Sequence, residues 1–223
     1  MNSQHLSVSG LAGIEFATNP EPRCACLVLA DTSGSMDGDP IAQLSAGLDG
    51  LKNNLIADPL ACLRVELALV TFNASVRTEV DFCSPANFLP SPLRATGGTA
   101  LGAGLIRALD MLEARRVSYR AAGLPYYRPW LVLITDAMAT DDVTEAARRV
   151  KEAESNKRVA FFGIGVKTAD MNKLAALSNR QPMHLDGLRF SDLFQWLSTS
   201  LSAVAVSRPG DQVPLPPPDW TTV

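Results

Sequence analysis

Residues 24–36 read CACLVLADTSGSM, and this stretch decides the fold. Its first part, residues 24–30, is a continuous apolar run of strand length, and its second part is small, polar and rich in side-chain oxygens. Similar apolar runs follow at residues 65–72, 130–135 and 159–166. Strands without polar alternation are typical of a parallel sheet that is covered on both faces. The sequence therefore predicts a parallel sheet at the centre of the fold.

Segments of helical period separate these strands. Asp39 and Pro40 begin the first of them, with Asp39 as the predicted N-cap and Pro40 as the first helical residue. Apolar residues recur at helical spacing in residues 41–55, 101–112, about 142–155, 171–177 and 193–204.

One segment alternates instead of running apolar. Val76, Thr78 and Val80 take turns with charged residues soon after the second strand, which predicts a hairpin to an antiparallel edge strand. We therefore expect an α/β fold: a doubly wound, mostly parallel sheet with one antiparallel edge strand and helices on both faces, of Rossmann-like form. Ligands of such sheets bind at the carboxyl ends of the strands.

The 223 residues divide into an N-terminal extension (1–21), one domain (22–206) and a C-terminal tail (207–223) that holds five of the 15 prolines. The tail either packs along its own domain or forms a polyproline II segment for a partner's groove. Leu215 and Trp220 favour packing, because they can anchor the tail within the molecule.

Charge and hydropathy exclude several classes of protein. The net charge is −3 and no run of five like charges occurs, which argues against a nucleic-acid partner. The chain carries no apolar run of the roughly 18 residues that a membrane span needs, so we expect no membrane partner and a cytoplasmic location. The four cysteines are too sparse for a disulfide framework. Cys24 and Cys26 are predicted to be reduced core thiols, with a metal or redox pair as the rival interpretation.

Hard oxygen ligands gather after the first strand. Asp31, Ser33 and Ser35 supply a carboxylate and two hydroxyls, a set that suits Mg²⁺ or Mn²⁺. Thr99 lies before the second long helix and Asp136 ends the strand 130–135, so the predicted fold brings both to the same edge. Ordinary helix capping is the alternative for such residues, but it does not explain all three segments in this order.

Three more carboxylates lie near this edge in the sequence. Asp37, Asp141 and Asp142 are possible rim residues. The blander interpretation is a solvated helix start, with Asp142 as its cap.

The three segments together resemble the von Willebrand factor A (VWA) domain family and its metal-ion-dependent adhesion site (MIDAS), over about residues 22–206. The resemblance implies that Ser33 and Ser35 bind the ion directly and that Thr99, Asp31 and Asp136 do so directly or through water. A carboxylate from a partner protein would complete the shell. The family commonly has glycine after the strand-terminal aspartate, where this chain has Ala137.

Within that family the chain looks like the bacterial TerY-like, tellurite-resistance-associated group. The similarity lies in residues 19–24, in residues 32–41, and in residues 194–198 together with 207–220. This resemblance implies a cytoplasmic signalling module in stress or defence systems, beside a Ser/Thr kinase and a PP2C-type phosphatase.

The chain lacks the catalytic residues that the enzymatic alternatives require. A haloacid-dehalogenase-type phosphatase needs an acid where this chain has Ser33, and no phosphate-binding P-loop motif occurs. His5 and His184 have no partners at catalytic spacing, so we expect a protein that is not an enzyme and a structural role for His184. A VWA subunit that recruits substrate to an AAA+ ATPase, as in chelatases, is the alternative function. Arg115, Arg116 and Arg120 lie near tyrosines and form either a docking face or a solvated helix end.

Overall fold

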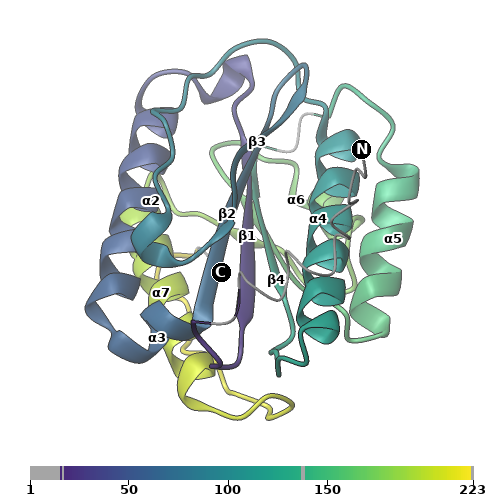
Figure 1. Ribbon diagram of the computed structural model, residues 1–223. Helices are drawn as coiled ribbons and strands as arrows, with labels where there is room; N and C mark the ends of the chain where they lie inside the picture. Colours follow the sequence, from purple (N-terminus) through teal and green to yellow (C-terminus); the bar gives the residue numbers. More distant parts are fainter. Residues whose placement is uncertain (1–15, 17, 137–138, 222–223) are drawn as a thin grey trace, which may run out of the picture.

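A sheet forms the centre of the molecule in the computed structural model, which describes residues 16, 18–136 and 139–221 (Figure 1). It has six strands. The strand order is β3-β2-β1-β4-β5-β6. Every neighbouring pair is parallel except β2 and β3, so the predicted mostly parallel sheet with one antiparallel edge strand is confirmed. The strands are β1 (Cys24–Asp31), β2 (Val65–Phe72), β3 (Val76–Cys83), β4 (Trp130–Thr135), β5 (Ala160–Gly165) and β6 (Met183–His184).

Helices cover both faces of the sheet, as predicted. The helices α2, α3 and α7 lie on one face and α4 and α5 on the other (Figure 1). Their bounds are α2 (Asp39–Ala57), α3 (Pro59–Arg64), α4 (Leu101–Ala121), α5 (Thr144–Ser155), α6 (Met171–Ala175) and α7 (Phe190–Val206), with short 3₁₀ turns η1 (Gly34–Met36) and η2 (Pro85–Asn87).

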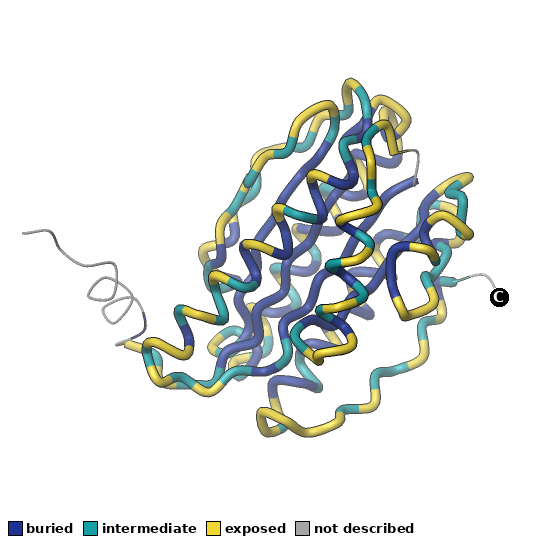
Figure 2. The backbone as a smooth tube through the Cα atoms, turned by 90° about the vertical axis from the view of Figure 1, so that its right-hand side faces the viewer, coloured by how far each residue is buried: buried dark blue, intermediate teal, exposed yellow. Residues whose placement is uncertain are grey.

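The apolar run of β1 supplies two cores at once. Cys26 and Val28 face the helices α2 and α7, whereas Leu27 and Leu29 face α4 and α5, and all four are fully buried. This alternation between two buried faces is why the strand shows no polar period. Figure 2 shows the central strands buried and the outer faces of the helices exposed. The strands β1, β2, β4 and β5 are buried along their whole length, whereas the edge strand β3 is partly exposed.

Helix starts differ from the predictions at two places. Gly38, with φ 84°, is the N-cap of α2, so Asp39 and Pro40 are its first and second residues rather than cap and first residue. Only glycine adopts this φ without strain, and a proline within the first turn removes no helical hydrogen bond. α5 begins at Thr144 rather than near Asp142.

Two other elements depart from expectation. The helix α3 was not predicted. Asp58 caps it by accepting hydrogen bonds from the amides of Leu60 and Ala61, and Pro59 begins it. The strand β5 is shorter than the predicted 159–166, because β4 offers it only six partner residues, from Trp130 to Thr135.

The C-terminal tail packs on its own domain, as its apolar anchors predict. The Trp220 side chain is fully buried, and its ring meets that of Trp196 edge-on at 5.6 Å between centroids. Trp196 Nε1 donates a hydrogen bond of 2.8 Å to the carbonyl of Pro216. Residues 1–15 of the predicted N-terminal extension lie outside the described residues. No described helix combines the length and apolarity that a bilayer crossing requires.

The arginines near the end of α4 do not form a common docking face. Arg115 Nε lies 2.7 Å from a carboxylate oxygen of Glu66, which is itself 6% exposed. Arg23 pairs with the same carboxylate at 3.3 Å, and the Tyr119 hydroxyl donates to it. Arg115 therefore belongs to a largely buried ion network, while Arg116 and Arg120 pair with Glu113 at the helix surface.

Candidate metal centre

The carboxylate of Asp31 is held rigidly at the end of β1. It is fully buried, Oδ1 accepts a hydrogen bond of 2.8 Å from the Ser33 amide, and Oδ2 accepts one of 2.6 Å from Thr135 Oγ1. β1 and β4 are neighbours in the sheet, which brings Thr135 to this position. The side chain thus has a single orientation set from two strands.

The two serines of the loop lie side by side. Ser33 Oγ and Ser35 Oγ are 3.0 Å apart, with Ser33 buried and Ser35 exposed. The 3₁₀ turn η1 produces this approach, and Met36, which is fully buried in the core below, anchors the turn. Two hydroxyl oxygens at this separation can face one common ligand.

Thr99 lies in a loop that is joined directly to the serine loop. The Gly34 amide donates to the Gly97 carbonyl at 3.0 Å, and the Thr96 amide donates to the Thr32 carbonyl at 2.8 Å. Gly97 has φ 75°, a conformation that favours glycine. The Thr99 residue is 4% exposed, and these two loop contacts hold its segment beside Ser33 and Ser35.

Asp136 brings a second buried carboxylate. It follows β4 directly and is 4% exposed. Burial raises the pKa of Asp31, and the negative charge of Asp136 raises it further, although hydrogen bonds from Ser33 and Thr135 oppose the rise. Asp31 forms no ion pair with a lysine or arginine in the described part of the chain.

The residues at this edge fit a hard divalent cation. The donors are carboxylate and hydroxyl oxygens, which Mg²⁺ and Mn²⁺ prefer, and a cation between the two buried carboxylates would offset their burial and mutual repulsion. Within residues 18–136 and 139–221, this edge of the sheet included, no group of three or more His, Cys, Asp or Glu side chains gathers as a metal site. The candidate site has only two carboxylates, so metal binding there would also require the three hydroxyl oxygens of its serines and threonine.

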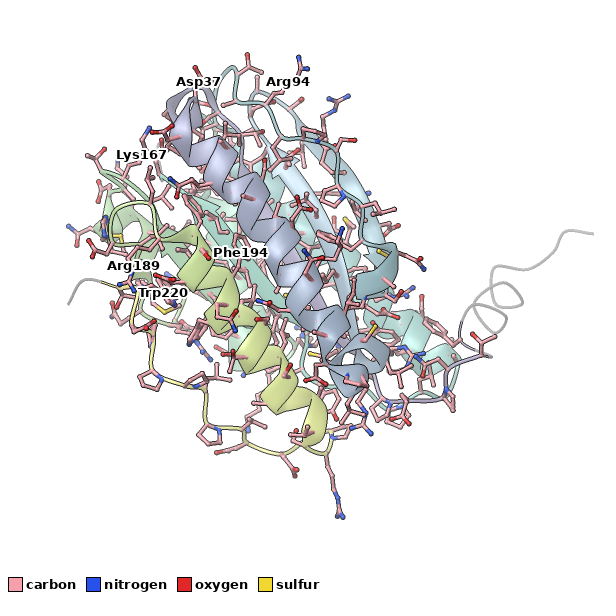
Figure 3. All side chains as sticks on the ribbon, turned by 90° about the vertical axis from the view of Figure 1, so that its left-hand side faces the viewer. Asp37, Arg94, Lys167, Arg189, Phe194 and Trp220 are labelled. Carbon is pink, nitrogen blue, oxygen red and sulfur yellow. The ribbon has the colours of Figure 1, made fainter. Side chains whose placement is uncertain are left out.

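The three possible rim carboxylates have different surroundings. Asp141 accepts hydrogen bonds from the amides of Gly102 and Ala103 at 3.0 and 2.9 Å, so it caps the start of α4. Asp142 accepts from the hydroxyl and the amide of Thr144 at the start of α5, and these bonds lower its pKa. Asp141 therefore caps α4. The N-cap residue of α5 is Val143 rather than the predicted Asp142, which binds the first helical residue, Thr144, from one position further out. Asp37 is exposed at the end of η1 (Figure 3).

Three residues at this site were not singled out in the sequence. Thr135 orients Asp31, and Thr140 Oγ1 accepts a hydrogen bond of 3.1 Å from the Thr99 amide. Lys167 Nζ donates a hydrogen bond of 2.5 Å to the Ser35 carbonyl from the loop after β5, so its positive charge lies beside the serine loop. Thr135 adjoins Asp136, so its place at the site could have been predicted from the sequence. The place of Lys167 could not, because 132 positions separate it from Ser35.

His184 lies outside the metal centre. Its Nε2 is 2.8 Å from the Lys167 carbonyl, a contact that links β6 to the loop after β5.

Comparisons with known proteins identify the family and the fold of this chain. The model of the von Willebrand factor type A domain family matches residues 27–192. No curated protein matches the chain by sequence.

Several solved structures share the fold. A von Willebrand factor type A protein from Catenulispora acidiphila superposes with a TM-score of 0.61 at 17% identity, over 82% of this chain and 43% of that one. The pilus adhesin SpaC from Lactobacillus rhamnosus GG gives 0.66 at 13% identity, over 83% and 31%. The mussel byssus proximal thread matrix protein 1, with a zinc-occupied MIDAS motif, gives 0.57 at 17% identity, over 82% and 49%.

The chain therefore spans only 31% to 49% of the length of these solved chains, and at such identities the likeness is one of fold. The family model covers most of the sequence, from the first strand to the start of α7, and includes all five candidate ligands. The chain belongs to the von Willebrand factor type A domain family.

Proposed function

We propose that this protein is a non-enzymatic, metal-dependent interaction module. Its divalent cation, Mg²⁺ or Mn²⁺, would be held by Asp31, Ser33, Ser35, Thr99 and Asp136, and a carboxylate of a partner protein would complete the coordination shell. The observation that carries the proposal is the pair of serine hydroxyls 3.0 Å apart, beside a buried aspartate that Thr135 holds in one orientation.

The charge of this site supports docking of an acidic group. Only two carboxylates contribute to the donor set, so a bound divalent cation would still favour a further anionic ligand. Lys167 adds a positive charge at the rim, where its ammonium group reaches the Ser35 carbonyl. An incoming Asp or Glu would meet positive potential on approach. In the mussel byssus protein the metal in the MIDAS motif is zinc, and SpaC is an adhesin.

The biological setting that we propose follows the resemblance to the TerY-like group. In that setting the protein is cytoplasmic, and its partner is a Ser/Thr kinase or a PP2C-type phosphatase of a bacterial stress or defence system. A role beside an AAA+ ATPase uses the same metal site, so the identity of the captured partner separates the two settings.

Metal binding is tested first, on the purified protein. Titration with Mn²⁺, followed by electron paramagnetic resonance, should show one bound ion in the unaltered protein and none in Asp31→Ala, with weaker binding in Ser33→Ala. Asp49→Ala is the matched control, because it removes an exposed carboxylate from the surface of α2. Unchanged Mn²⁺ affinity in a folded Asp31→Ala variant would exclude this site.

Partner binding is tested by capture from native lysate in Mg²⁺ and in EDTA. The Asp31→Ala/Asp136→Ala double variant should lose the partner that the unaltered protein and Asp49→Ala retain. Recovery of a kinase or phosphatase supports the proposed setting, and recovery of an AAA+ ATPase replaces it. If the partner is recovered equally well in EDTA and with the double variant, docking through the metal is contradicted.

A further inference from the structure

A cavity lies at the opposite end of the sheet from the metal centre. It has a volume of about 740 Å³ and lies where β4 and β5 begin, at Trp130 and Ala160. The metal loops follow the carboxyl ends of these parallel strands, so the two sites are separated by the length of the sheet. This volume falls within the range of small-molecule sites in proteins.

The tail forms one wall of this cavity. Seven residues between Ser207 and Leu215 line it, and the Tyr127 hydroxyl fixes the start of the wall by donating a hydrogen bond of 2.7 Å to the Ser207 carbonyl. Further along, Leu215 packs against the core. The tail runs past this end of the molecule as an extended, mostly exposed segment (Figure 2).

The cavity concentrates positive charge in a protein whose net charge is negative. Five basic residues line it, against the single carboxylate of Asp211: Arg116, Arg128, Lys157, Arg158 and Arg180. Arg116 pairs with Glu113 and Arg158 with Glu152. The other three form no ion pair with any described residue.

Two of these cations, Arg128 and Arg180, lie close enough for their charges to repel each other. Burial lowers the pKa of the Arg128 guanidinium and the positive charge of Arg180 lowers it further, although Glu154 opposes the fall. Arg128 Nε is buried without a hydrogen-bond partner among the described residues, while its NH2 donates at 3.1 Å to the Glu154 carbonyl. Leaving a buried donor of a charged group unpaired costs stability unless a ligand or water satisfies it.

The position of Arg180 completes the arrangement. Its guanidinium lies over the ring of Phe162, 4.8 Å from the centroid, which holds this exposed side chain against the cavity wall. Two guanidinium groups with forked donors, together with the ammonium of Lys157, match the oxygens of phosphate groups.

From this cavity we propose a second binding site, for a small phosphorylated molecule that carries several negative charges. Arg128, Arg180 and Lys157 would bind its phosphate oxygens, and the tail would close over one side. The site goes beyond the proposed metal-dependent docking and needs no metal, because its positive charge comes from side chains alone.

The probe is inorganic tripolyphosphate, titrated calorimetrically into the full chain in EDTA, so that no divalent cation bridges the phosphate to the metal centre. We expect one binding event per chain, weakened about tenfold or more in Arg128→Gln and in Arg180→Gln, since a charged hydrogen bond is worth about 1.5–3 kcal/mol. Arg180 is exposed, so its variant should fold even if Arg128→Gln does not. Lys173→Gln removes an exposed cation outside the cavity and should bind as the unaltered protein does.

Two results would overturn the site: no binding of tripolyphosphate in EDTA, or binding that Arg180→Gln and Lys173→Gln leave equally strong. A salt titration separates a built site from diffuse attraction. Binding at the cavity should survive 0.15 M salt, where charges separated by more than about 8 Å are largely screened. Complete loss at that salt concentration would also count against the proposal.

Discussion

At the scale of single residues, burial decides what each side chain does. Asp31 and Asp142 are both aspartates near the carboxyl edge of the sheet, yet Asp31 is fully buried whereas Asp142 is exposed and accepts hydrogen bonds from Thr144 at the start of α5. Burial raises the pKa of Asp31 and hydrogen bonds lower that of Asp142. The two residues are of the same type, so only their exposure and their hydrogen-bond partners distinguish the candidate metal ligand Asp31 from Asp142 at the start of a helix.

The cysteines give a first test at this scale. Burial raises the pKa of Cys24 to about 12 and that of Cys26 well above its ordinary value, so both stay protonated at neutral pH. Because the thiolate is the nucleophile, we expect iodoacetamide at pH 8 to modify the partly exposed Cys62 and to spare Cys24 and Cys26 until the protein unfolds. Mass spectrometry of tryptic peptides reads the pattern. Rapid labelling of Cys24 in the folded protein would contradict it.

Asp58 gives a second test, with a pH dependence. A hydrogen bond from Ser202, followed by one from the Ala61 amide, lowers the pKa of Asp58. A lowered folded-state pKa means that the carboxylate contributes stability above its unfolded pKa of about 3.9 and loses that contribution as the pH falls through the folded value. Asp58→Ala should therefore reduce the free energy of unfolding by about 1 kcal/mol at pH 7, and by less as the pH falls below 4.

Urea denaturation at several pH values measures the Asp58 effect, with Asp49→Ala as the control. Asp49 is exposed on α2, so its replacement should change stability little at any pH. A loss in Asp58→Ala that stays constant down to pH 2 would show that the cap does not act through its charge.

At the scale of elements, close packing of helices depends on where glycine lies. The helices α2 and α7 lie side by side, with Phe194 on α7 (Figure 3). They approach closely at Gly47, where a Cβ atom would lie 2.3 Å from a ring carbon of Phe194. Gly50, one turn further along α2, has nothing within 4 Å of the same position. Both residues look alike in the sequence, and only the neighbouring helix distinguishes them.

The two glycines make a matched pair of variants. Gly47→Ala should lower the free energy of unfolding by about 1–3 kcal/mol, because the Phe194 ring must move in a packed core. Gly50→Ala should raise it by up to about 1 kcal/mol, because alanine favours the helix and meets no neighbour. Thermal and urea denaturation measure both. Equal effects of the two substitutions would mean that α2 and α7 do not pack as described.

At the scale of the whole molecule, the tail is part of the fold. Trp220 is fully buried and the Asp186 amide donates to its carbonyl at 3.0 Å, so residues far beyond α7 complete the core beneath that helix. The same segment lines the basic cavity, while the metal loops lie at the other end of the strands. One chain thus carries a candidate site at each end of its sheet.

The tail can be tested through Trp220. Trp220→Ala should lower the free energy of unfolding by about 3–5 kcal/mol, the usual loss for a large buried ring. Trp220→Phe should cost less, because Trp220 Nε1 has no hydrogen-bond partner among the described residues and a ring still fills the site. Leu89→Ala, at a side chain that is 71% exposed, is the control. A melting temperature unchanged in Trp220→Ala would show that the tail does not pack.

Much of the fold was predictable because it rests on patterns within single segments. The continuous apolar runs of β1, β2 and β4 indicated strands buried on both faces, and the alternation in β3 indicated an edge strand with one face in solvent. The order of Asp31, Ser33, Ser35, Thr99 and Asp136 was enough to predict where the candidate ligands meet, because parallel strands end at one edge. Neither the capping of α2 by Gly38 nor the helix α3 was predicted. Both depend on the backbone conformation of a few residues in a turn, which the periodicity of apolar residues does not reveal.

The sequence by itself therefore determined the mostly parallel sheet with its antiparallel edge strand, the family and the choice of candidate metal ligands, all of which depend on local period and on motifs. Only the tertiary structure decided which contacts join distant segments. It brought Lys167 to Ser35, turned Arg115 toward the buried Glu66, and gathered Arg128 and Arg180 in one cavity. Long-range contacts of this kind leave no period in the chain, because they depend on how the helices and the tail fold back over the sheet.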